Sequence, residues 1–273
     1  MRILATSPAY APGVRTRYAP TPSGYLHIGN AAHLMIVAAI AQREGAQIHL
    51  RIDDADHDRF RREYLEDIFQ VLQWRDLPWD SGPRSCDESA HWAQETRMPH
   101  YRRALESLVA TGHAYACVCS RAQWHAYTGD GCPGECRSAR LSHAPGRTTW
   151  RLHLSGHVDP VIWRRDDIPA YHLASVVDDD LLSIDLVIRG QDLRQSTEIQ
   201  REISLLLPDS KFHSGQVLHH RLALDDAGAK LSKSAGSQAQ PLPRTDETRR
   251  RVAQLATELS TGLIPARPRS PGS

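Results

Sequence analysis

Segments with strand periodicity alternate with segments of helical periodicity along most of this chain. A strand is expected over residues 14–19, and the run from Asn30 to Arg43 has the apolar content of a buried helix. Gly45 ends that helix, and residues 47–52 then alternate in polarity as a second strand would. Regular alternation of strand and helix predicts an α/β fold built on a doubly wound parallel sheet.

The alternation is interrupted between residues 116 and 159 and then resumes. The expected helices cover residues 61–74, 98–111, 170–177, 196–207 and 246–259, and the later strands cover residues 185–189 and 219–224. We therefore divide the chain into a first half of the α/β domain (14–115), an insertion (116–159), a second half (160–240) and a short helical tail (241–273). Residues 265–273 at the end of the tail are expected to be disordered.

A pair of motifs near opposite ends of the chain indicates a single ATP site. Residues 22–29 read Pro-Ser-Gly-Tyr-Leu-His-Ile-Gly and lead into a helix, whose N-terminus offers free N–H groups and a partial positive charge. Gly29 allows a bound nucleotide to lie close to the backbone. Residues 230–234 read Lys-Leu-Ser-Lys-Ser, and Lys230 and Lys233 are suited to grip a polyphosphate as pyrophosphate leaves.

Four cysteines in the interrupted region form two close pairs. Cys117 and Cys119 make the first pair, and Cys132 and Cys136 make the second. Two short chelating turns of this kind supply four thiolates to a tetrahedral zinc ion and leave no open position for catalysis. The alternative is four unligated thiols. Cys86 lies outside the cluster and is expected to be a free thiol.

Composition bounds the partners and the compartment. The formal net charge is +1, so no overall excess of basic residues indicates a nucleic-acid partner. For such binding, the local electrostatic field along a groove matters more than the net charge. Arg59, Arg61 and Arg62 are read either as a nucleic-acid contact or as a solvated helix face. The chain lacks a long apolar run and a secretory leader, which predicts a cytoplasmic protein with no membrane partner. We expect a monomer.

The two motifs resemble the HIGH and KMSKS signatures of the class I aminoacyl-tRNA synthetases. The intervening text is similar to the glutamyl-tRNA synthetase branch of that family. Residues 17–21 read Arg-Tyr-Ala-Pro-Thr, residues 51–54 read Arg-Ile-Asp-Asp, and residues 188–193 read Ile-Arg-Gly-Gln-Asp-Leu. The resemblance implies a Rossmann-like class I synthetase fold with a small zinc-binding insertion and a short helical tail.

The resemblance also implies the residues of an active site for ATP, Mg²⁺ and glutamate. An enzyme that activates glutamate needs an arginine for the side-chain carboxylate and an acid for the ammonium group. The implied catalytic residues are His27, Asn30, Lys230 and Lys233. The implied ATP-binding residues are His27, Gly29, Asn30, Lys230, Ser232 and Lys233. The implied amino-acid-binding residues are Arg17, Tyr18, Ala19, Pro20, Thr21, Asp53, Tyr171 and Arg189.

The sequence around the four cysteines is similar to that of the glutamyl-Q tRNA(Asp) synthetases, the truncated relatives of glutamyl-tRNA synthetase. These carry a Cys-x-Cys and then a Tyr-x-x-x-Cys-Arg zinc element, so Cys132 stands where that family usually has tyrosine. A cysteine favours the metal, because a phenol must first lose a proton of pKa about 10. The resemblance implies transfer of glutamate to the queuosine base in the anticodon loop of tRNA(Asp), with the anticodon stem-loop as a partner.

Departures from the family text keep other hypotheses open. Asp53 stands in place of the glutamate of Arg-Ile-Glu-Asp, His172 in place of an asparagine, and only a short tail follows Ser234. These departures favour an alternative, a paralogue that activates an amino acid and loads a carrier protein or a small amine. A catalytically idle relative is the third hypothesis, and the intact signature residues speak against it.

Overall fold

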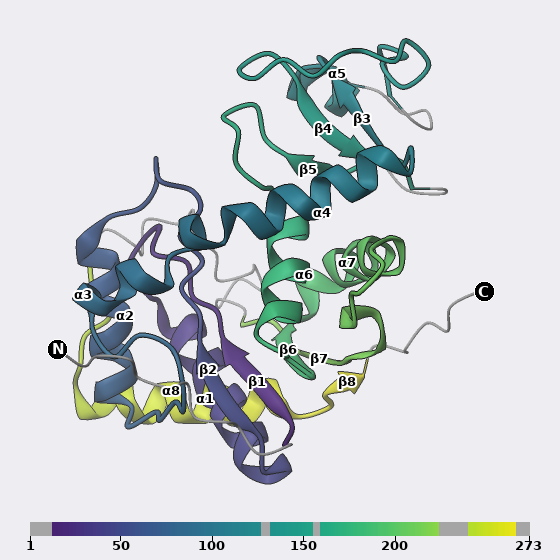
Figure 1. Ribbon diagram of the computed structural model, residues 1–273. Coiled ribbons are helices and arrows are strands. Elements are labelled where there is room, and N and C mark those ends of the chain that lie inside the picture. Colours follow the sequence, from purple (N-terminus) through teal and green to yellow (C-terminus); the bar gives the residue numbers. More distant parts are fainter. Residues whose placement is uncertain (1–12, 127–131, 155–158, 224–239, 266–273) are drawn as a thin grey trace, which may run out of the picture.

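A computed structural model describes residues 13–126, 132–154, 159–223 and 240–265 (Figure 1). The lysine motif, with Lys230, Ser232 and Lys233, lies outside the described residues. Residues 266–273, most of the end that was expected to be disordered, also lie outside the described residues.

The core of the fold is formed by two pairs of parallel strands. Strand β1 (Arg15–Tyr18) pairs with β2 (Gln47–Leu50), and β6 (Leu186–Gly190) pairs with β7 (Gln216–His220). Strand β1 lies beside β6, and the N–H of Asp185 donates to the carbonyl of Arg15 at 2.9 Å (Figure 1). The short strand β8 (Ile264–Pro265) adds an antiparallel edge to β7.

Helices cover both faces of these strands, as a doubly wound sheet requires. Leu186 and Ile188 point into one apolar core, whereas Val187 between them points into the other. The first core holds helices α1 (Ile28–Glu44), α2 (Arg62–Trp74) and α8 (Asp246–Ser260), and the second holds α4 (Met98–Ala110), α6 (Tyr171–Leu181) and α7 (Arg194–Leu206). The α/β fold predicted from the alternation is therefore confirmed.

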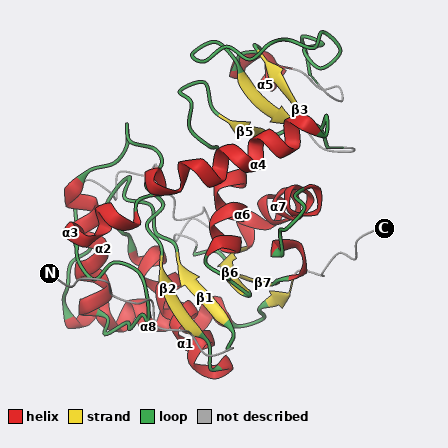
Figure 2. Cartoon of the chain, viewed as in Figure 1, coloured by secondary structure: helices red, strands yellow, loops and turns green. Residues whose placement is uncertain are grey.

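The interrupted region contains a separate antiparallel sheet. It consists of β3 (Ala114–Cys117), β4 (Thr149–Leu152) and β5 (Val161–Trp163), with helix α5 (Arg121–Ala126) after β3. Figure 2 shows this sheet set apart from the parallel strands, with α4 running between the two regions. Its strands extend beyond the predicted insertion 116–159 at both ends, because pairing between strands rather than composition decides where the sheet stops.

Some element boundaries differ from those expected. The strand expected over residues 219–224 is β7, which starts earlier because its register places Leu186 opposite Gln216 and Gly190 opposite His220. Pro265, expected in a disordered end, pairs with Leu218. Short helices not foreseen from periodicity are α3 (Cys86–Ser89), η1 (Ala90–Trp92), η2 (Gln94–Arg97), η3 (Gln191–Leu193) and η4 (Phe212–Ser214). Among the described helices, none has both the length and the apolar character needed to cross a membrane.

Candidate active site and metal centre

His27 caps the N-terminus of α1. Its Nδ1 atom accepts hydrogen bonds from the backbone N–H groups of Gly29 at 3.0 Å and Asn30 at 3.4 Å. The Asn30 side chain accepts one in return from the backbone N–H of His27 at 3.1 Å, which completes a capping box. The capping bonds fix the tautomer of His27, because Nδ1 as acceptor leaves the proton on Nε2 in the neutral ring.

Gly29 lies close against the ring of His27. A Cβ atom at position 29 would lie 3.0 Å from Cε1 and 3.1 Å from Nδ1 of that ring. The sequence suggested that this glycine leaves space for a nucleotide. The structure shows that it also leaves space for the capping histidine, so both signature residues act on one turn of backbone.

A network of ion pairs at the ends of β1 and β2 joins Arg17, Arg51, Asp53 and Asp179. Asp179 accepts from Nε of Arg17 at 3.0 Å and from Nη1 of Arg51 at 2.7 Å, and Arg51 also donates to both oxygens of Asp53 at 2.6 and 3.1 Å. Burial opposes ionisation of Asp179, but the two guanidinium groups outweigh it and lower the pKa of that carboxyl. Asp53 and Arg17 were predicted to touch the substrate, and in this structure both are held by protein partners.

A second buried carboxylate, Asp178, was not foreseen from the sequence. It accepts from Arg97 at 2.7 Å, from the hydroxyl of Tyr101 at 2.5 Å and from the amide of Gln94 at 2.9 Å. Adjacent acidic residues near the end of an apolar helix were the signal that the sequence offered. This carboxylate ties α4 and η2 to α6 and thereby places Gln94 at the site.

Arg189 is a buried cation that pairs with no carboxylate among the described residues. Its Nη1 donates to Oε1 of Gln200 at 2.6 Å and to the hydroxyl of Thr197 at 3.3 Å, whereas Nε and Nη2 have no hydrogen-bond partner. The side chain is only 3% exposed. Burial lowers the pKa of Arg189, the nearby Tyr171 phenol opposes that shift, and Arg17 adds to it by repulsion.

A cavity of about 230 Å³ brings together side chains from distant parts of the sequence. Thr21, Asp53 and Tyr171, all predicted to bind the amino acid, line it. Ser175 also lines it, and its buried hydroxyl has no partner among the described residues. The sequence did not single out Ser175, because a serine on the apolar side of a helix gives no distinct signal.

A second cavity, of about 150 Å³, lies at the start of α1. It is lined by Ala19, Pro20, Thr21 and Asn30, together with His33. Burial and the neighbouring His220 lower the pKa of His33 to about 3, so this ring is neutral near pH 7. Thr21 lines both cavities, which places them side by side.

Tyr18 does not line either cavity. Its side chain is fully buried in the apolar core, and burial raises the pKa of its phenol. This differs from the expected place of the Tyr18 side chain beside the amino acid, and a contact between the two stays a prediction. Alternation along β1 explains the difference, because Arg17 and Tyr18 point to opposite faces of the strand.

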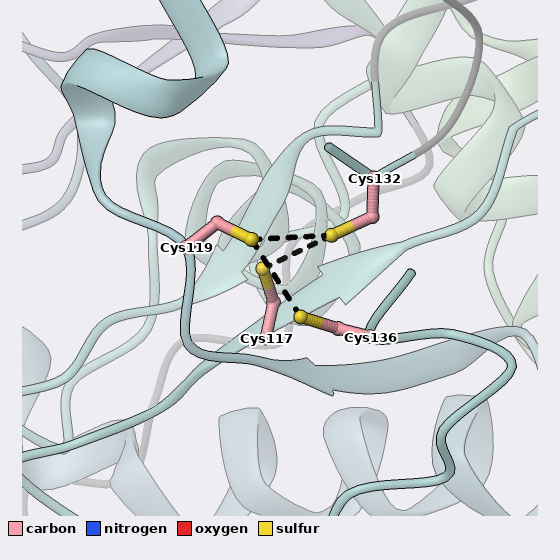
Figure 3. A group of neighbouring side chains, drawn as sticks. All are labelled: Cys117, Cys119, Cys132 and Cys136. Atoms are coloured by element: carbon pink, nitrogen blue, oxygen red, sulfur yellow. Dashed lines mark hydrogen bonds between the residues drawn. The ribbon is translucent and has the colours of Figure 1, made fainter. Parts of the chain in front are cut away.

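The four cysteines of the insertion converge on one point. Sγ of Cys132 lies 3.7 Å from Sγ of Cys117 and 3.5 Å from Sγ of Cys119, and Cys119 lies 3.6 Å from Cys136 (Figure 3). All four sulfur atoms lie within 4.8 Å of one another. A tetrahedral zinc with Zn–S bonds of about 2.3 Å needs sulfur atoms about 3.8 Å apart, so the thiols fit such an ion.

Gly134 makes the close approach of these sulfurs possible. A Cβ atom at this position would lie 2.7 Å from Sγ of Cys119. Burial opposes ionisation of Cys132, but the backbone N–H groups of Gly134 and Cys136 outweigh it and lower the pKa of that thiol. Arg165 donates to the carbonyl of Val118 at 2.7 Å and thus holds the first cysteine turn.

A cleft of about 770 Å³ separates the cysteine sheet from the loop after β2. Its lining includes Arg59, Arg151, Arg164 and Arg165, and Asp56, Arg59 and Arg164 also line the 230 Å³ cavity. Trp124 stacks under the guanidinium of Arg151 at 3.7 Å. By contrast, Arg62 lies on the exposed face of α2 and pairs with Glu66 and Asp87, as a solvated helix face does.

Comparison with known proteins identifies the family. The model of the class I tRNA synthetases (E and Q), catalytic domain, matches residues 13–141 and 148–255. A glutamyl-Q tRNA(Asp) synthetase of Symbiobacterium thermophilum is 34% identical over 255 residues, which cover 81% of this chain and 78% of that protein. A glutamate–tRNA ligase of Dehalococcoides mccartyi is 35% identical over 211 residues, or 67% of this chain and 43% of that protein.

The chain therefore belongs to the class I tRNA synthetases of the E and Q type, a family of ATP-using ligases. Its fold is similar to that of a glutamate tRNA ligase from Elizabethkingia meningosepticum, with a TM-score of 0.68 at 24% identity over 83% of this chain and 53% of that one. The chain spans about half the length of the glutamate–tRNA ligases that it matches. It spans about four-fifths of the glutamyl-Q relatives, so the predicted resemblance to a truncated synthetase is confirmed.

Proposed function

We propose that this chain activates glutamate with ATP as glutamyl-adenylate and transfers it to the queuosine base of tRNA(Asp). The relatives named glutamyl-Q tRNA(Asp) synthetase, matched over most of their length, support this proposal. The cavity lined by Thr21, Asp53 and Tyr171 supports a small amino acid as the first substrate.

The observation that carries the proposal is that the buried Arg189 pairs with no carboxylate among the described residues. The buried Arg17 and Arg51 and the half-buried Arg97 each pair with an aspartate. Arg189 has no such partner in the described part of the chain and keeps two buried N–H groups unsatisfied. A buried guanidinium is stabilised by a carboxylate that accepts two parallel hydrogen bonds, and the side chain of glutamate supplies one.

Activation itself requires little covalent chemistry from the protein. The α-carboxylate of the bound amino acid attacks the α-phosphorus of ATP, the bond to the bridging oxygen breaks, and pyrophosphate leaves with the electron pair. The carboxylate is already ionised near neutral pH, so no general base is needed. His27, with its proton on Nε2, and Asn30 would donate to the nucleotide, while Lys230, Lys233 and Mg²⁺ would neutralise the leaving group.

The four cysteines are proposed to hold a structural zinc ion. The ligand set is complete without water, which is typical of zinc that stabilises a fold rather than one that catalyses a reaction. Cys119 lines the large cleft, so the metal would fix the backbone at that edge of the cleft. Zinc would therefore shape the path to the amino-acid cavity.

The large cleft is proposed to receive the acceptor. It is lined by Arg59, Arg151, Arg164 and Arg165 and opens next to the amino-acid cavity. Arginines and an aromatic ring are suited to phosphate groups and unpaired bases of a single-stranded loop. Arg164 pairs with Asp166 at 2.6 Å, so part of the positive charge of the cleft is neutralised within the protein.

Amino-acid-dependent pyrophosphate exchange, measured without tRNA for each of the twenty amino acids, tests the first step. Glutamate should support exchange, and Arg189→Gln should abolish exchange with glutamate. Exchange with an uncharged amino acid in preference to glutamate would contradict the assignment of Arg189 to the substrate carboxylate.

Transfer of labelled glutamate then tests the acceptor. We expect labelling of tRNA(Asp) that contains queuosine and none of tRNA(Asp) that lacks it. The competing hypothesis, a carrier protein or small amine as acceptor, predicts exchange with glutamate and no labelling of either tRNA. That result would overturn the tRNA(Asp) proposal while leaving the activation step intact.

A further inference from the structure

The buried carboxylate of Asp67 contacts two distant segments at the nucleotide side of the site. Asp67 lies on α2 and is 2% exposed. Its Oδ2 accepts the backbone N–H of Leu26 at 2.8 Å, and its Oδ1 accepts Nη2 of Arg244 at 2.6 Å. Neither the family resemblance nor the periodicity of the sequence pointed to these contacts.

The first contact acts on the turn that carries His27. Leu26 immediately precedes His27, and the backbone N–H of His27 donates to the side chain of Asn30. Two successive N–H groups of the turn are therefore held by side chains, one from α2 and one from α1. This arrangement fixes the backbone from which the His27 ring projects, and Leu26 itself is buried in the core.

The second contact joins that turn to the C-terminal segment. Arg244 precedes α8, whose cap is Thr245, and α8 packs along α1 with Val252, Ala256 and Leu259 in the shared core. Burial raises the pKa of Asp67, while the Leu26 amide and Arg244 oppose that shift. Arg244 thus favours the charged form of a buried acceptor, and a charged acceptor binds the Leu26 N–H more strongly.

Building on the function proposed above, we propose that Asp67 and Arg244 are positioning residues that hold the Leu26–His27 turn in place for ATP. The C-terminal segment would then be part of the catalytic unit rather than an appended tail. Asp67 acts through backbone and does not touch the substrate. Its loss should therefore impair use of ATP and leave glutamate binding unchanged.

The test combines hydrogen–deuterium exchange at the Leu26 amide with pyrophosphate-exchange kinetics. In Asp67→Ala the Leu26 amide should exchange faster, and kcat/KM for ATP should fall about 10- to 100-fold, as expected for loss of a hydrogen bond to a charged group. The KM for glutamate should stay within about twofold. Arg244→Lys, which preserves the charge, should retain most of the activity.

A matched control lies on the same helices. Arg249 on α8 pairs with Asp76, which follows α2, in an exposed ion pair away from the signature turn. Arg249→Ala should change neither readout. Should Asp67→Ala fail to fold, Asp67→Asn replaces it, since an asparagine offers one acceptor oxygen to two donors and must weaken one contact.

The outcomes separate this inference from the proposed function. Unchanged protection of the Leu26 amide in Asp67→Ala overturns the positioning role, whatever the enzyme activates. Faster amide exchange with an unchanged kcat/KM for ATP also overturns it, because the contact is then only structural. Absence of pyrophosphate exchange in the unaltered protein would refute the proposed function. Hydrogen–deuterium exchange at the Leu26 amide in Asp67→Ala would still report on the turn.

Discussion

Replacement of Arg189 by methionine should stabilise the free protein while abolishing glutamate activation. Methionine is unbranched and uncharged, so it fills the space of the aliphatic part of the arginine without a cation. In the described structure Arg189 is buried, pairs with no carboxylate and leaves two N–H groups unsatisfied. An uncompensated buried charge costs several kcal/mol, which the substitution removes.

The substitution also removes hydrogen bonds that Arg189 donates, and their loss opposes the gain in stability. Arg189 donates to Gln200 and Thr197, and Thr197 keeps other partners at Leu193 and His219. Only the Gln200 oxygen is left without a donor, at a cost of about 1–3 kcal/mol. We therefore expect a net gain of about 1–2 kcal/mol, which raises the unfolding midpoint by about 2–8 °C.

Arg51→Met is the matched control. Arg51 pairs with both Asp53 and Asp179, so its removal leaves buried carboxylates with fewer partners. Breaking a buried pair of this kind costs about 3–5 kcal/mol and should lower the midpoint by about 6–20 °C. The same type of substitution should therefore act in opposite directions at the two positions.

Scanning calorimetry without substrate, repeated with glutamate, measures both effects. Glutamate at 100 times its dissociation constant should stabilise the unaltered protein by about 2.7 kcal/mol and should not stabilise Arg189→Met. A fall in midpoint for Arg189→Met as large as that for Arg51→Met would refute the reasoning. It would mean that Arg189 already has a partner within the protein.

Two further predictions concern the metal and pH. Gly134→Ala should lower zinc content, measured by metal analysis after dialysis against a chelator, because its Cβ would press on Sγ of Cys119; full retention of zinc would contradict the four-thiolate geometry. Burial and neighbouring arginines lower the pKa of His219 to about 4, so the unfolded chain binds a proton first as pH falls. Its contribution to stability is present above pH about 6.5 and is lost on acidification, by about 2 kcal/mol at pH 5. His219→Asn should therefore show a weaker loss of stability between pH 7 and pH 5 in urea denaturation, and an equal loss would contradict the assignment.

The helices and the parallel strands could be predicted from periodicity because their apolar faces are long. The helix predicted from Asn30 to Arg43 is α1, and that predicted over residues 98–111 is α4. The cysteine sheet was missed because β3, β4 and β5 are short and pair only with one another. Their position depends on pairing across the insertion, which no local pattern records.

The candidate site divides in the same way. The start of helix α1 at the signature turn and the convergence of the four cysteines follow from spacing within short segments. The Tyr18 side chain lies in the apolar core, and a sequence motif alone does not tell which face of a strand a residue occupies. Ser175 and Gln94 reach the amino-acid cavity only because α6 and η2 are packed against it.

The sequence by itself determined the fold class, the signature turn and the metal-ligating pattern, since each depends on residues that are close along the chain. Only the tertiary structure decided how the charges are paired. Arg17 meets Asp179 across 162 positions, and Arg244 meets Asp67 across 177. Burial makes such pairs strong and leaves Arg189 buried without a carboxylate partner among the described residues. The physical reason is that the exclusion of water strengthens the interaction between two charges. Water is excluded only once distant segments have packed together.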